Sequence, residues 1–526
     1  MSKLLKGLKL GLGSHISSNF NAFLPSTFLS RYYKMSHIKS SSQHVTVALD
    51  DTEIKICNLL DAVSRQCPEN KTPTLRIAGG WVRDKLLSIP CHDIDVAVDC
   101  MSGFEFAQLV HRYCEQNNIQ NSGRVVRIDA NPSKSKHLET ATGRLFGIDV
   151  DFVGLRSHAY THHSEENKFG TPLEDALRRD TTINSLFYNI HTRSVEDFTE
   201  MGLEDLEKKV IQTPLPAMET FSDDALRAVR CIRFASKFQF SIHPETQAGI
   251  QNPAVQHTLL HSISRERIGT EVEKMLKNKN AKLAVDLSYQ LHIADAIFGP
   301  LPDVQSKLQG TKSATNIDIF SATSLFQQLI VSDPAYKNLS VDDIYMMWLA
   351  IAFLPWRYVT LAQGKQYKTL PYFLAKESLK LGNSVANYQD YLYSNTDSIT
   401  DSVNRAHKAA YELPASFYGV LIRSLDANWK QAILWAQYLE FLKQPDNKDQ
   451  VKQKYMGFFN KVQALQLENA YQLKPVLNGK QIASLLKIKA GPQIKDLLSQ
   501  LIEWQFDHTN ASIAECEQFV KGLITQ

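Results

Sequence analysis

The chain has 526 residues, of which 43% are hydrophobic and 21% are charged, and its formal net charge is +3. This length is too great for one compact core, so we expect two to four domains, and the ordinary composition excludes disordered and fibrous proteins. The weak net charge means that a nucleic-acid partner requires a local basic surface, and the lack of a long apolar run predicts no transmembrane helix and no membrane partner.

The first 49 residues contain no Asp or Glu but six Lys or Arg residues, and several leucines can share one helical face. Such a segment is typical of a mitochondrial targeting peptide, which we assign to residues 1–34. The alternative is a basic arm that contacts RNA. Met35 would serve as a second start, giving cytoplasmic and nuclear forms. The seven cysteines form no C-x-x-C pair, which indicates reduced thiols rather than a disulfide framework or a zinc site.

Residues 45–175 alternate between helical and strand patterns, which predicts an α/β sheet domain. We expect helices over 54–65, 81–87 and 104–114. We expect strands over 74–78, 94–98, 124–128 and 148–153. Residues 131–142 are rich in Asn, Pro, Ser, Lys and Thr and predict a loop.

Helical patterns dominate after residue 173, so we place a boundary near residue 175 and another in the Gly- and Pro-containing region 298–316. The expected fold class is α+β. A small mixed-sheet head at 45–175 is followed by an all-helical neck at 176–305. A helical body and tail at 306–526 complete the chain, with amphipathic helices over about 310–470.

Two acidic residues on one expected strand are candidate metal ligands. Alternation places Asp93 and Asp95 on one face while Ile94 and Val96 enter the core. Two carboxylates this close repel, and Mg²⁺, which prefers oxygen ligands, would supply the missing charge. A third carboxylate on a neighbouring strand would complete a two-metal site for attack at a phosphate. Spacing alone does not choose between Asp149 and Asp151, and a D-x-D pair also occurs on ordinary surface strands.

The turn before this strand is a candidate phosphate-binding site. Gly79 and Gly80 end one expected strand and open a helix. Because Gly lacks Cβ, backbone N–H groups at the turn can approach a triphosphate closely. The guanidinium of Arg83 can bind phosphate oxygens. The alternative is a plain strand-to-helix turn with a surface Arg.

Residues 75–87 (LRIAGGWVRDKLL), followed by Asp93-Ile94-Asp95, resemble the first motif of the class II CCA-adding enzymes. These are tRNA nucleotidyltransferases of the polymerase-β superfamily, related to bacterial poly(A) polymerases. The resemblance favours Asp151 over Asp149, because Asp151 lies five residues before Arg156 as in the family. It implies that three carboxylates are catalytic and bind the metal ions: Asp93, Asp95 and Asp151. It also implies nucleotide binding by Gly80 and Arg83, and a mobile loop at 134–142 that assists A addition.

Residues 177–186 (LRRDTTINSL) resemble the family's second motif. The motif supplies Arg179, whose guanidinium can donate hydrogen bonds to phosphate. Asp180 and Asn184 can bond ribose hydroxyls, and the resemblance implies that the motif selects NTP over dNTP. Thr181 stands where the family usually has an aromatic residue. A capped helix start with an exposed basic pair is the alternative. A weaker third motif, taken as a hinge between head and neck, is matched at Asp197, Gly202, Asp205 and Leu206.

Residues 222–234 contain a candidate site for recognising the base. We expect Asp224 and Arg227 at i and i+3 on one helix, where their side chains are neighbours. An acceptor beside a donor fork matches cytosine and adenine, which present an amino group and a ring-nitrogen acceptor. Guanine and uracil present the opposite order, and each mispaired buried group costs about 1–3 kcal/mol. A surface salt bridge is the alternative.

This segment resembles the family's fourth motif, E-D-x-x-R, matched at Asp224 and Arg227. The resemblance implies that Arg230 and Arg233 are further nucleotide-binding residues. Asp223 stands where the family usually has Glu, which would shift the contact that this carboxylate makes.

Two later segments resemble supporting parts of the family. Residues 264–276 resemble the fifth motif, in which Glu266 and Arg267 would support the base-recognition helix; a capped surface helix is the alternative. Residues 478–494 combine a helix, a Gly-Pro turn and several lysines, which can hold a phosphate backbone. They resemble the family's tail, which contacts the tRNA elbow.

The sequence therefore predicts an enzyme that adds CMP, CMP and AMP from CTP and ATP to the tRNA 3′ end without a nucleic-acid template. We expect a monomer with Mg²⁺ as cofactor and no DNA partner. One alternative is a poly(A) polymerase of the same superfamily, against which the targeting segment argues. Another is a non-catalytic tRNA-binding protein, against which the intact carboxylates argue.

Overall fold

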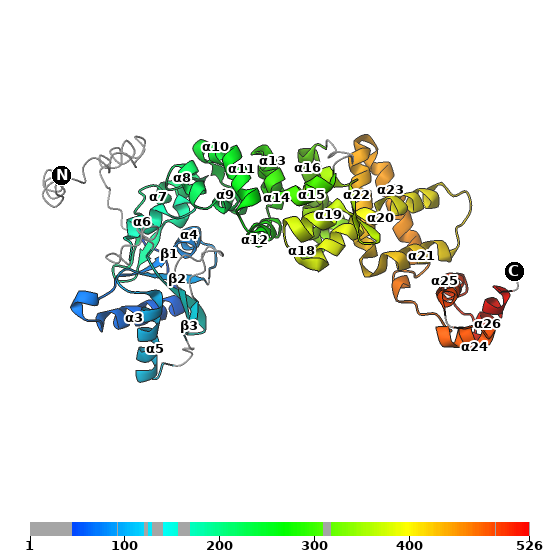
Figure 1. The fold of residues 1–526 in the computed structure, drawn as a ribbon, viewed down its shortest axis with the longest axis horizontal. Helices are drawn as coiled ribbons and strands as arrows, with labels where there is room; N and C mark the ends of the chain where they lie inside the picture. Colours follow the sequence, from blue (N-terminus) through cyan, green and yellow to red (C-terminus); the bar gives the residue numbers. More distant parts are fainter. Residues whose placement is uncertain are drawn as a thin grey trace. The chain divides into compact units, whose positions relative to one another are not determined.

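The computed structural model describes residues 45–91, 93–119, 125–128, 140–155, 169–308, 317–489 and 491–524 (Figure 1). The chain divides into two compact units, Met1–Leu215 and Pro216–Gln526. The expected targeting segment, Arg156 and most of the expected loop lie outside the described residues. Within these ranges, no helix is long and apolar enough to cross a membrane.

The first unit is built on a mixed sheet with the strand order β3-β4-β5-β2-β1-β6-β7. Strands β2 and β5 run parallel, and the other neighbours in the sheet run antiparallel. The strands are β1 (Leu75–Ala78), β2 (Ile94–Val98), β3 (Val126–Ile128), β4 (Thr140–Leu145), β5 (Ile148–Gly154), β6 (Phe187–Asn189) and β7 (Ser194–Glu196), with β8 (Val210–Ile211) outside this sheet. A mixed sheet followed by helices confirms the expected α+β class.

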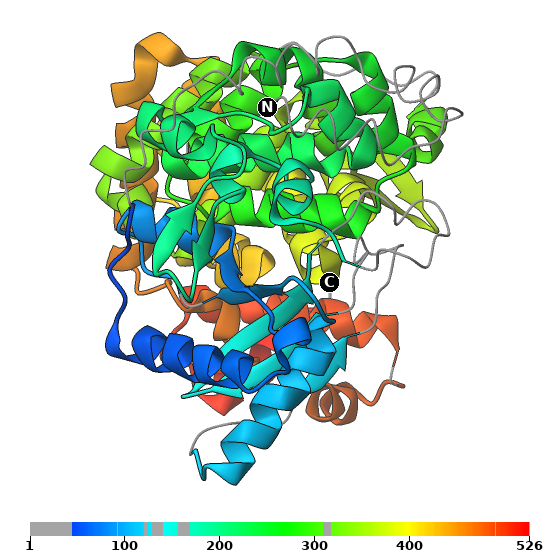
Figure 2. The ribbon, with the colours of Figure 1, turned by 90° about the vertical axis from the view of Figure 1, so that its left-hand side faces the viewer.

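Helices α3 and α5 lie on the same face of this sheet (Figure 2). Each begins with a capping box, formed by Asp50 with Glu53 and by Ser102 with Glu105. Such a box bonds two helical N–H groups that otherwise have no partner. The helices of this unit are α3 (Asp51–Arg65), α4 (Gly80–Leu86), α5 (Gly103–Gln116), α6 (Pro172–Leu177) and α7 (Gly202–Lys208).

A glycine fixes how closely α5 approaches the sheet. A Cβ at Gly103 would lie 2.1 Å from the carbonyl oxygen of Phe152 in β5. The ring of Phe106, one turn further along α5, then packs on the ring of Phe152, with 5.8 Å between their centroids. This packing fills the core on the side of β5 opposite to its acidic residues.

Two features of the first unit differ from the sequence-based expectation. The loop prediction is wrong for residues 140–142, which begin β4. Its sequence, TATGRL, replaces the usual apolar alternation by Thr and Gly, so the strand pattern is weak. Strands β6 and β7 complete the sheet after residue 175, so the expected boundary lies inside the unit. β6 is buried on both faces and therefore shows no alternation.

The second unit is mainly helical within the described residues. Its helices are α8 (Ala217–Asp223), α9 (Leu226–Phe238), α10 (Pro244–Ile250), α11 (Pro253–His261), α12 (Arg265–Leu276), α13 (Ala281–Gln290), α14 (Ala294–Phe298), α15 (Pro302–Gln305), α16 (Ile319–Ser332), α17 (Pro334–Lys337), α18 (Val341–Ala352), α19 (Leu370–Phe373), α20 (Gly382–Lys408), α21 (Ala415–Leu425), α22 (Trp429–Lys443), α23 (Lys448–Ala464), α24 (Gly479–Leu486), α25 (Pro492–Asp507) and α26 (Ile513–Gly522). A two-residue strand, β9 (Ser241–Ile242), follows α9.

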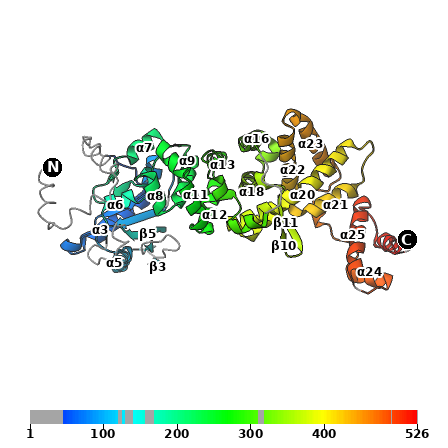
Figure 3. The same ribbon diagram turned by 45° about the horizontal axis from the view of Figure 1, so that its top comes forward.

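A hairpin of β10 (Thr360–Gln363) and β11 (Gln366–Thr369) interrupts these helices (Figure 3). We expected only helices over 310–470, so this part of the prediction is wrong. The sequence does carry a turn signal there, which is Gly364. This residue has a positive φ of 62° in the turn, a conformation that Gly adopts at no steric cost.

Candidate active site

Strand register brings two of the predicted carboxylates together. Asp95 on β2 lies directly opposite Asp151 on the parallel strand β5, and residues opposite each other share a face of the sheet. Asp95 is exposed and Asp151 is half-buried, whereas their neighbours Val96 and Phe152 are buried. Asp93 is exposed and lies immediately before β2. The open face of β2 and β5 therefore carries a concentration of negative charge.

Asp149 and Asp151 have different partners on the adjacent strand β4. Asp151 is opposite Thr142, whose hydroxyl donates to Oδ1 of Asp151 at 2.5 Å. Asp149 is opposite Arg144, at 3.9 Å, and its side chain is 71% exposed. Across the described ranges, no group of three His, Cys, Asp or Glu side chains stands close enough to form a metal site. The backbone thus aligns the carboxylates, while three such side chains do not meet at one point in this part of the chain.

The glycine turn is shaped by contacts with the second motif. Gly79 has φ 72°, and its N–H donates to the carbonyl of Leu186 at 2.9 Å. A Cβ at Gly79 would lie 2.6 Å from Nη1 of Arg179. Gly80 is the first residue of α4, and the guanidinium of Arg83 lies over it, 3.4 Å from the position of a Cβ. The first and second motifs can therefore pack closely against each other, because the glycines at the turn have no side chain.

Arg83 is buried, with only 5% of its surface exposed, so the surface-Arg alternative is wrong. Its Nε and Nη2 lie 2.8 and 2.7 Å from Oδ1 of Asp84. Its Nη1 donates to Oδ1 of Asn184. Asn184 in turn donates to Asp180 at 2.8 Å. This chain of hydrogen bonds joins the helix of the first motif to the two predicted ribose-binding residues.

Arg179 and Asp180 are held by their own local partners. Arg179 pairs with Asp175 at 2.7 Å and lies over the ring of Phe187, 5.0 Å from its centroid. Asp180 is buried and accepts from the backbone N–H of Thr181 at 2.8 Å. These contacts fix the orientations of the Arg179 and Asp180 side chains.

The third motif supports the second. Asp205 accepts a hydrogen bond of 2.6 Å from the hydroxyl of Thr182. A Cβ at Gly202 would lie 2.6 Å from the carbonyl oxygen of the same Thr182. Asp197 accepts from the N–H of Leu203 at 2.9 Å, which fixes the start of α7. The glycine and the two acids of this motif thus hold the segment that carries Asp180 and Asn184.

The expected i, i+3 helical pair of Asp224 and Arg227 is wrong. Helix α8 ends at Asp223 and α9 begins at Leu226, so Asp224 lies in the break with extended backbone, φ −155° and ψ 103°. An Asp at a break can accept from N–H groups at the next helix start, and Oδ1 of Asp224 accepts from Leu226 N–H at 3.2 Å.

Arg267 holds the carboxylate of Asp224. Nη2 and Nη1 of Arg267 donate to the two carboxylate oxygens of Asp224, at 2.6 and 3.3 Å. Arg227 instead donates to the carbonyl of Thr220 at 3.2 Å and lies 3.7 Å from Asp223. The predicted support by Arg267 is therefore a direct bidentate ion pair. Glu266, predicted to act with it, is exposed.

Glu271 on α12 is a site residue that the sequence analysis missed. It is 4% exposed, and its carboxylate accepts from Nε of Arg233 and lies 3.5 Å from Nη1 of Arg230. The guanidinium of Arg233 also lies 4.1 Å from the centroid of the Phe234 ring. The signal was available, because residue 271 shares the helical face of the apolar residues Ile268 and Val272.

Comparisons with known proteins show which family the chain resembles. Residues 75–212 match the family described as poly A polymerase head domain, and residues 239–308 match the probable RNA and SrmB-binding site of polymerase A. The tRNA nucleotidyltransferase cca1 of Schizosaccharomyces pombe is 43% identical, over 90% of this chain and 96% of that protein. The chain belongs to the tRNA nucleotidyltransferase family.

A further relative supports the family, and two solved structures share the fold. The mitochondrial CCA tRNA nucleotidyltransferase of Saccharomyces cerevisiae is 35% identical, over 91% of this chain and 94% of that protein. The Thermotoga maritima CCA-adding enzyme, solved with tRNA, has a TM-score of 0.59 at 19% identity, over 90% of this chain and 96% of that one. The Bacillus stearothermophilus enzyme, solved with CTP, has a TM-score of 0.60 at 17% identity, over 91% and 98%. The predicted family and fold are confirmed.

Proposed function

We propose that this chain adds CMP, CMP and AMP from CTP and ATP to the 3′ end of tRNA without a template. The observation that carries the proposal is the opposed pair Asp95 and Asp151, on the same unit as the Gly79–Gly80 turn, in a chain similar over nearly its full length to CCA-adding enzymes. In the reaction, the tRNA 3′-hydroxyl attacks the α-phosphorus of the nucleotide. The bond from that phosphorus to the bridging oxygen of pyrophosphate breaks, and pyrophosphate leaves.

Asp93, Asp95 and Asp151 would hold Mg²⁺. They fit this ion because all three are carboxylates and the two on paired strands share one face. The hydroxyl of Thr142 limits the rotation of Asp151. Bound Mg²⁺ supplies stabilisation of charge on the phosphate oxygens and favours the deprotonated form of an attacking hydroxyl.

The predicted nucleotide-binding residues have separate roles. Gly80 and Arg83, with Arg179, would hold phosphates, and Asp180 and Asn184 would bond the ribose hydroxyls. Asp224 and Arg227 would bond the base edge, with Arg230 and Arg233 as further contacts. Because Arg267 fixes both oxygens of Asp224, the acceptor is oriented before a base arrives. Preorganisation of this kind favours bases that carry an amino donor.

We also propose a mitochondrial location, with cytoplasmic and nuclear forms starting at Met35. Two relatives, from Saccharomyces cerevisiae and Candida glabrata, are mitochondrial enzymes by name. We propose that the chain acts as a monomer on tRNA and not on DNA. The domains would be a targeting segment at 1–34, a catalytic head, a neck that binds the nucleotide base, and a body and tail that bind tRNA.

The test uses purified protein and a tRNA transcript that lacks its three terminal nucleotides. CTP alone should extend the transcript by two nucleotides, and CTP with ATP by three, whereas GTP and UTP should not be incorporated. Chelation by EDTA should abolish extension, and added Mg²⁺ should restore it. Long tails from ATP alone would instead indicate a poly(A) polymerase. Binding of the transcript without extension under any condition would contradict the proposal.

A further inference from the structure

The β10–β11 hairpin lies in a stretch with an unusual charge balance. Residues 344–376 contain no Asp or Glu. The same stretch contains four basic residues and, between 356 and 373, five aromatic ones. The basic residues are Arg357, Lys365, Lys368 and Lys376. In a chain with a net charge of only +3, the exposed residues of such a stretch are candidates for the local basic surface that RNA binding requires.

The base of the hairpin is fixed to helix α20. Oδ1 of Asp390 accepts from the N–H of Thr369 at 2.8 Å, and its Oδ2 lies 2.8 Å from Nζ of Lys368. The N–H of Leu370 donates to the carbonyl of Val359 at 2.7 Å, which joins the two strands at the same end. An isolated two-stranded hairpin is marginally stable, so these contacts hold this one in place. They also neutralise Lys368.

The tip of the hairpin, residues 362–367, faces solvent. Tyr367 is 76% exposed and lies opposite Ala362 on β10, so only a methyl group stands beside its ring on that strand. Lys365 is exposed in the turn. The guanidinium of Arg357 lies 4.6 Å from the ring centroid of Tyr358, which is 52% exposed. Within the described part of the chain, neither Lys365 nor Arg357 has a carboxylate at ion-pair distance.

An exposed lysine beside an exposed aromatic ring suits a nucleic acid, which carries planar bases beside its phosphates. Unpaired lysines bind phosphates, and an exposed Tyr ring packs on a base or ribose. A hairpin that only needed to stay soluble would not require an exposed ring of this size at its solvent face. We propose that the tip of this hairpin, through Lys365 and Tyr367, binds the backbone of the RNA substrate away from its reacting 3′ end. This inference rests on the proposed function for the identity of that RNA as tRNA.

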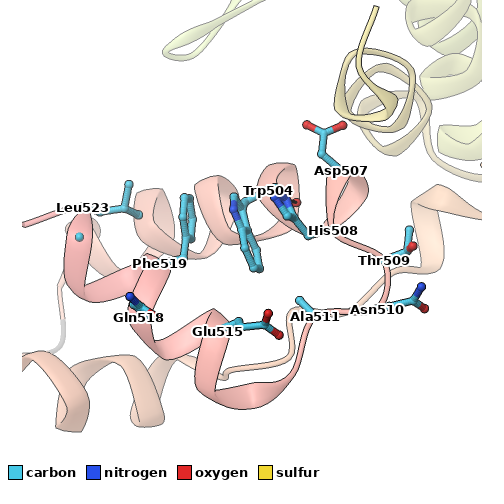
Figure 4. Close-up of a pocket in the computed structure, with 11 residues that line it drawn as sticks. Trp504, Asp507, His508, Thr509, Asn510, Ala511, Glu515, Gln518, Phe519 and Leu523 are labelled. Atoms are coloured by element: carbon cyan, nitrogen blue, oxygen red, sulfur yellow. Dashed lines mark hydrogen bonds between the residues drawn. The ribbon is translucent and has the colours of Figure 1, made fainter.

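A second aromatic group in the same unit, which is half-buried, does not suit this role. Trp504 is stacked between His508 and Phe519, with centroid distances of 4.1 and 4.8 Å. The stack borders an open hollow of about 760 Å³ that Asp507 and Glu515 also line (Figure 4). Carboxylates at the hollow repel phosphates, so the positive hairpin is the better site for an RNA backbone.

The proposal is tested with the full-length double variant Lys365→Ala/Tyr367→Ala and a tRNA transcript lacking its terminus. Fluorescence anisotropy should show about tenfold weaker RNA binding, because a phosphate contact and a ring contact are both lost. The slope of log Kd against log salt concentration should fall by about 0.7–0.9, as expected for one phosphate. The KM for CTP and the kcat at saturating tRNA should not change.

The matched control is Tyr411→Ala/Lys443→Ala, which removes an equally exposed ring and one exposed lysine from elsewhere in the unit. It should bind RNA like the unaltered chain, and thermal unfolding should show that both variants fold. Equal affinity of the hairpin variant and the unaltered chain, or an equal loss in the control, would overturn the proposal. If the unaltered chain added no CMP but the hairpin variant still bound RNA more weakly, only the proposed function would fail.

Discussion

Asp149 and Asp151 are two residues apart on β5 and share a face of the sheet, yet their surroundings differ. Asp151 stands opposite Asp95 and accepts a hydrogen bond from Thr142, whereas Asp149 is highly exposed beside Arg144. Thr142 holds Asp151 through a hydrogen bond, as residues around metal sites often hold the ligands, whereas Asp149 lies beside a cation.

This difference predicts opposite results for two matched variants. Asp151→Asn should lower the rate of CMP addition by roughly 10³-fold or more, since loss of several kcal/mol of metal-dependent stabilisation costs a factor of ten for every ~1.4 kcal/mol. Asp149→Asn should retain nearly full activity. Single-turnover incorporation of labelled CTP measures both rates. Comparable losses in the two variants would contradict the assignment of the third carboxylate.

Arg267 provides the second residue-scale prediction. Without its two hydrogen bonds, Asp224 is free to rotate and no longer presents a fixed acceptor to the base. Arg267→Ala should therefore reduce the preference for CTP over UTP by about tenfold, within the ~1–3 kcal/mol assigned to one mispaired group. The ratio of kcat/KM for the two nucleotides measures this preference.

The control for this variant is Lys274→Ala, which removes an exposed cation from the same helix. Its nucleotide preference should match that of the unaltered chain. If Arg267→Ala lowered kcat/KM for CTP and UTP equally, Arg267 would have a general structural role and not one in base selection.

At the scale of elements, helix α12 holds the segment proposed to bind the base from several positions. Arg267 and Glu271 hold Asp224, Arg230 and Arg233. Arg265, on the opposite side, donates to the carbonyls of Ser378 and Ala296, and burial lowers its pKa to about 10, so it stays charged at neutral pH. The contacts on both sides therefore fix the position of α12 relative to the segment with Asp224, Arg230 and Arg233 and relative to the backbone at Ala296 and Ser378.

Gly269 sets that position, which gives an element-scale prediction. A Cβ at Gly269 would lie 1.9 Å from the carbonyl oxygen of Leu379, whereas a Cβ at Gly457, in the middle of α23, meets nothing within 4 Å. Gly269→Ala should lower the free energy of unfolding by about 1–3 kcal/mol through overpacking. Gly457→Ala should raise it by up to about 1 kcal/mol, because Ala is the better helix former.

Chemical denaturation of the two variants measures these changes. Both substitutions add one methyl group to a helix of the same unit, so their difference isolates the contact with Leu379. A Gly269→Ala protein as stable as Gly457→Ala would show that α12 can move without cost. The role of Gly269 in positioning Arg267 would then be wrong.

For the whole molecule, the small net charge makes the distribution of lysines decisive for RNA binding. Lys487 and Lys489 are exposed beside the start of α25, where the sequence resembles the family's tail. Lys487→Ala/Lys489→Ala should raise the KM for tRNA several-fold and weaken its salt dependence, and should leave the KM for CTP unchanged. Steady-state kinetics over a range of salt concentrations measure both effects. Lys521→Ala, in α26, serves as the control, and an equal increase there would contradict a specific tail contact.

The sequence by itself determined those parts that depend on neighbouring residues. The alternation around Asp95 predicted β2 and its acidic face, and the Gly79–Gly80 turn followed from the freedom of Gly at positive φ. The contiguous motifs identified the family, because each groups its functional side chains within about a dozen residues. The same local rules predicted the class of fold and the helices that flank the sheet.

Only the tertiary structure decided which distant residues act together. The position of Asp151 opposite Asp95 depends on pairing between strands far apart in the chain. The partner of Asp224 is Arg267, 43 residues away, and not the neighbouring Arg227. Register and ion pairing between distant elements are set by packing of the whole core, whereas periodicity reports only how each segment divides its own faces. A strand without alternation, such as β6, is therefore seen only in the folded chain. The same holds for the helix break at Asp224.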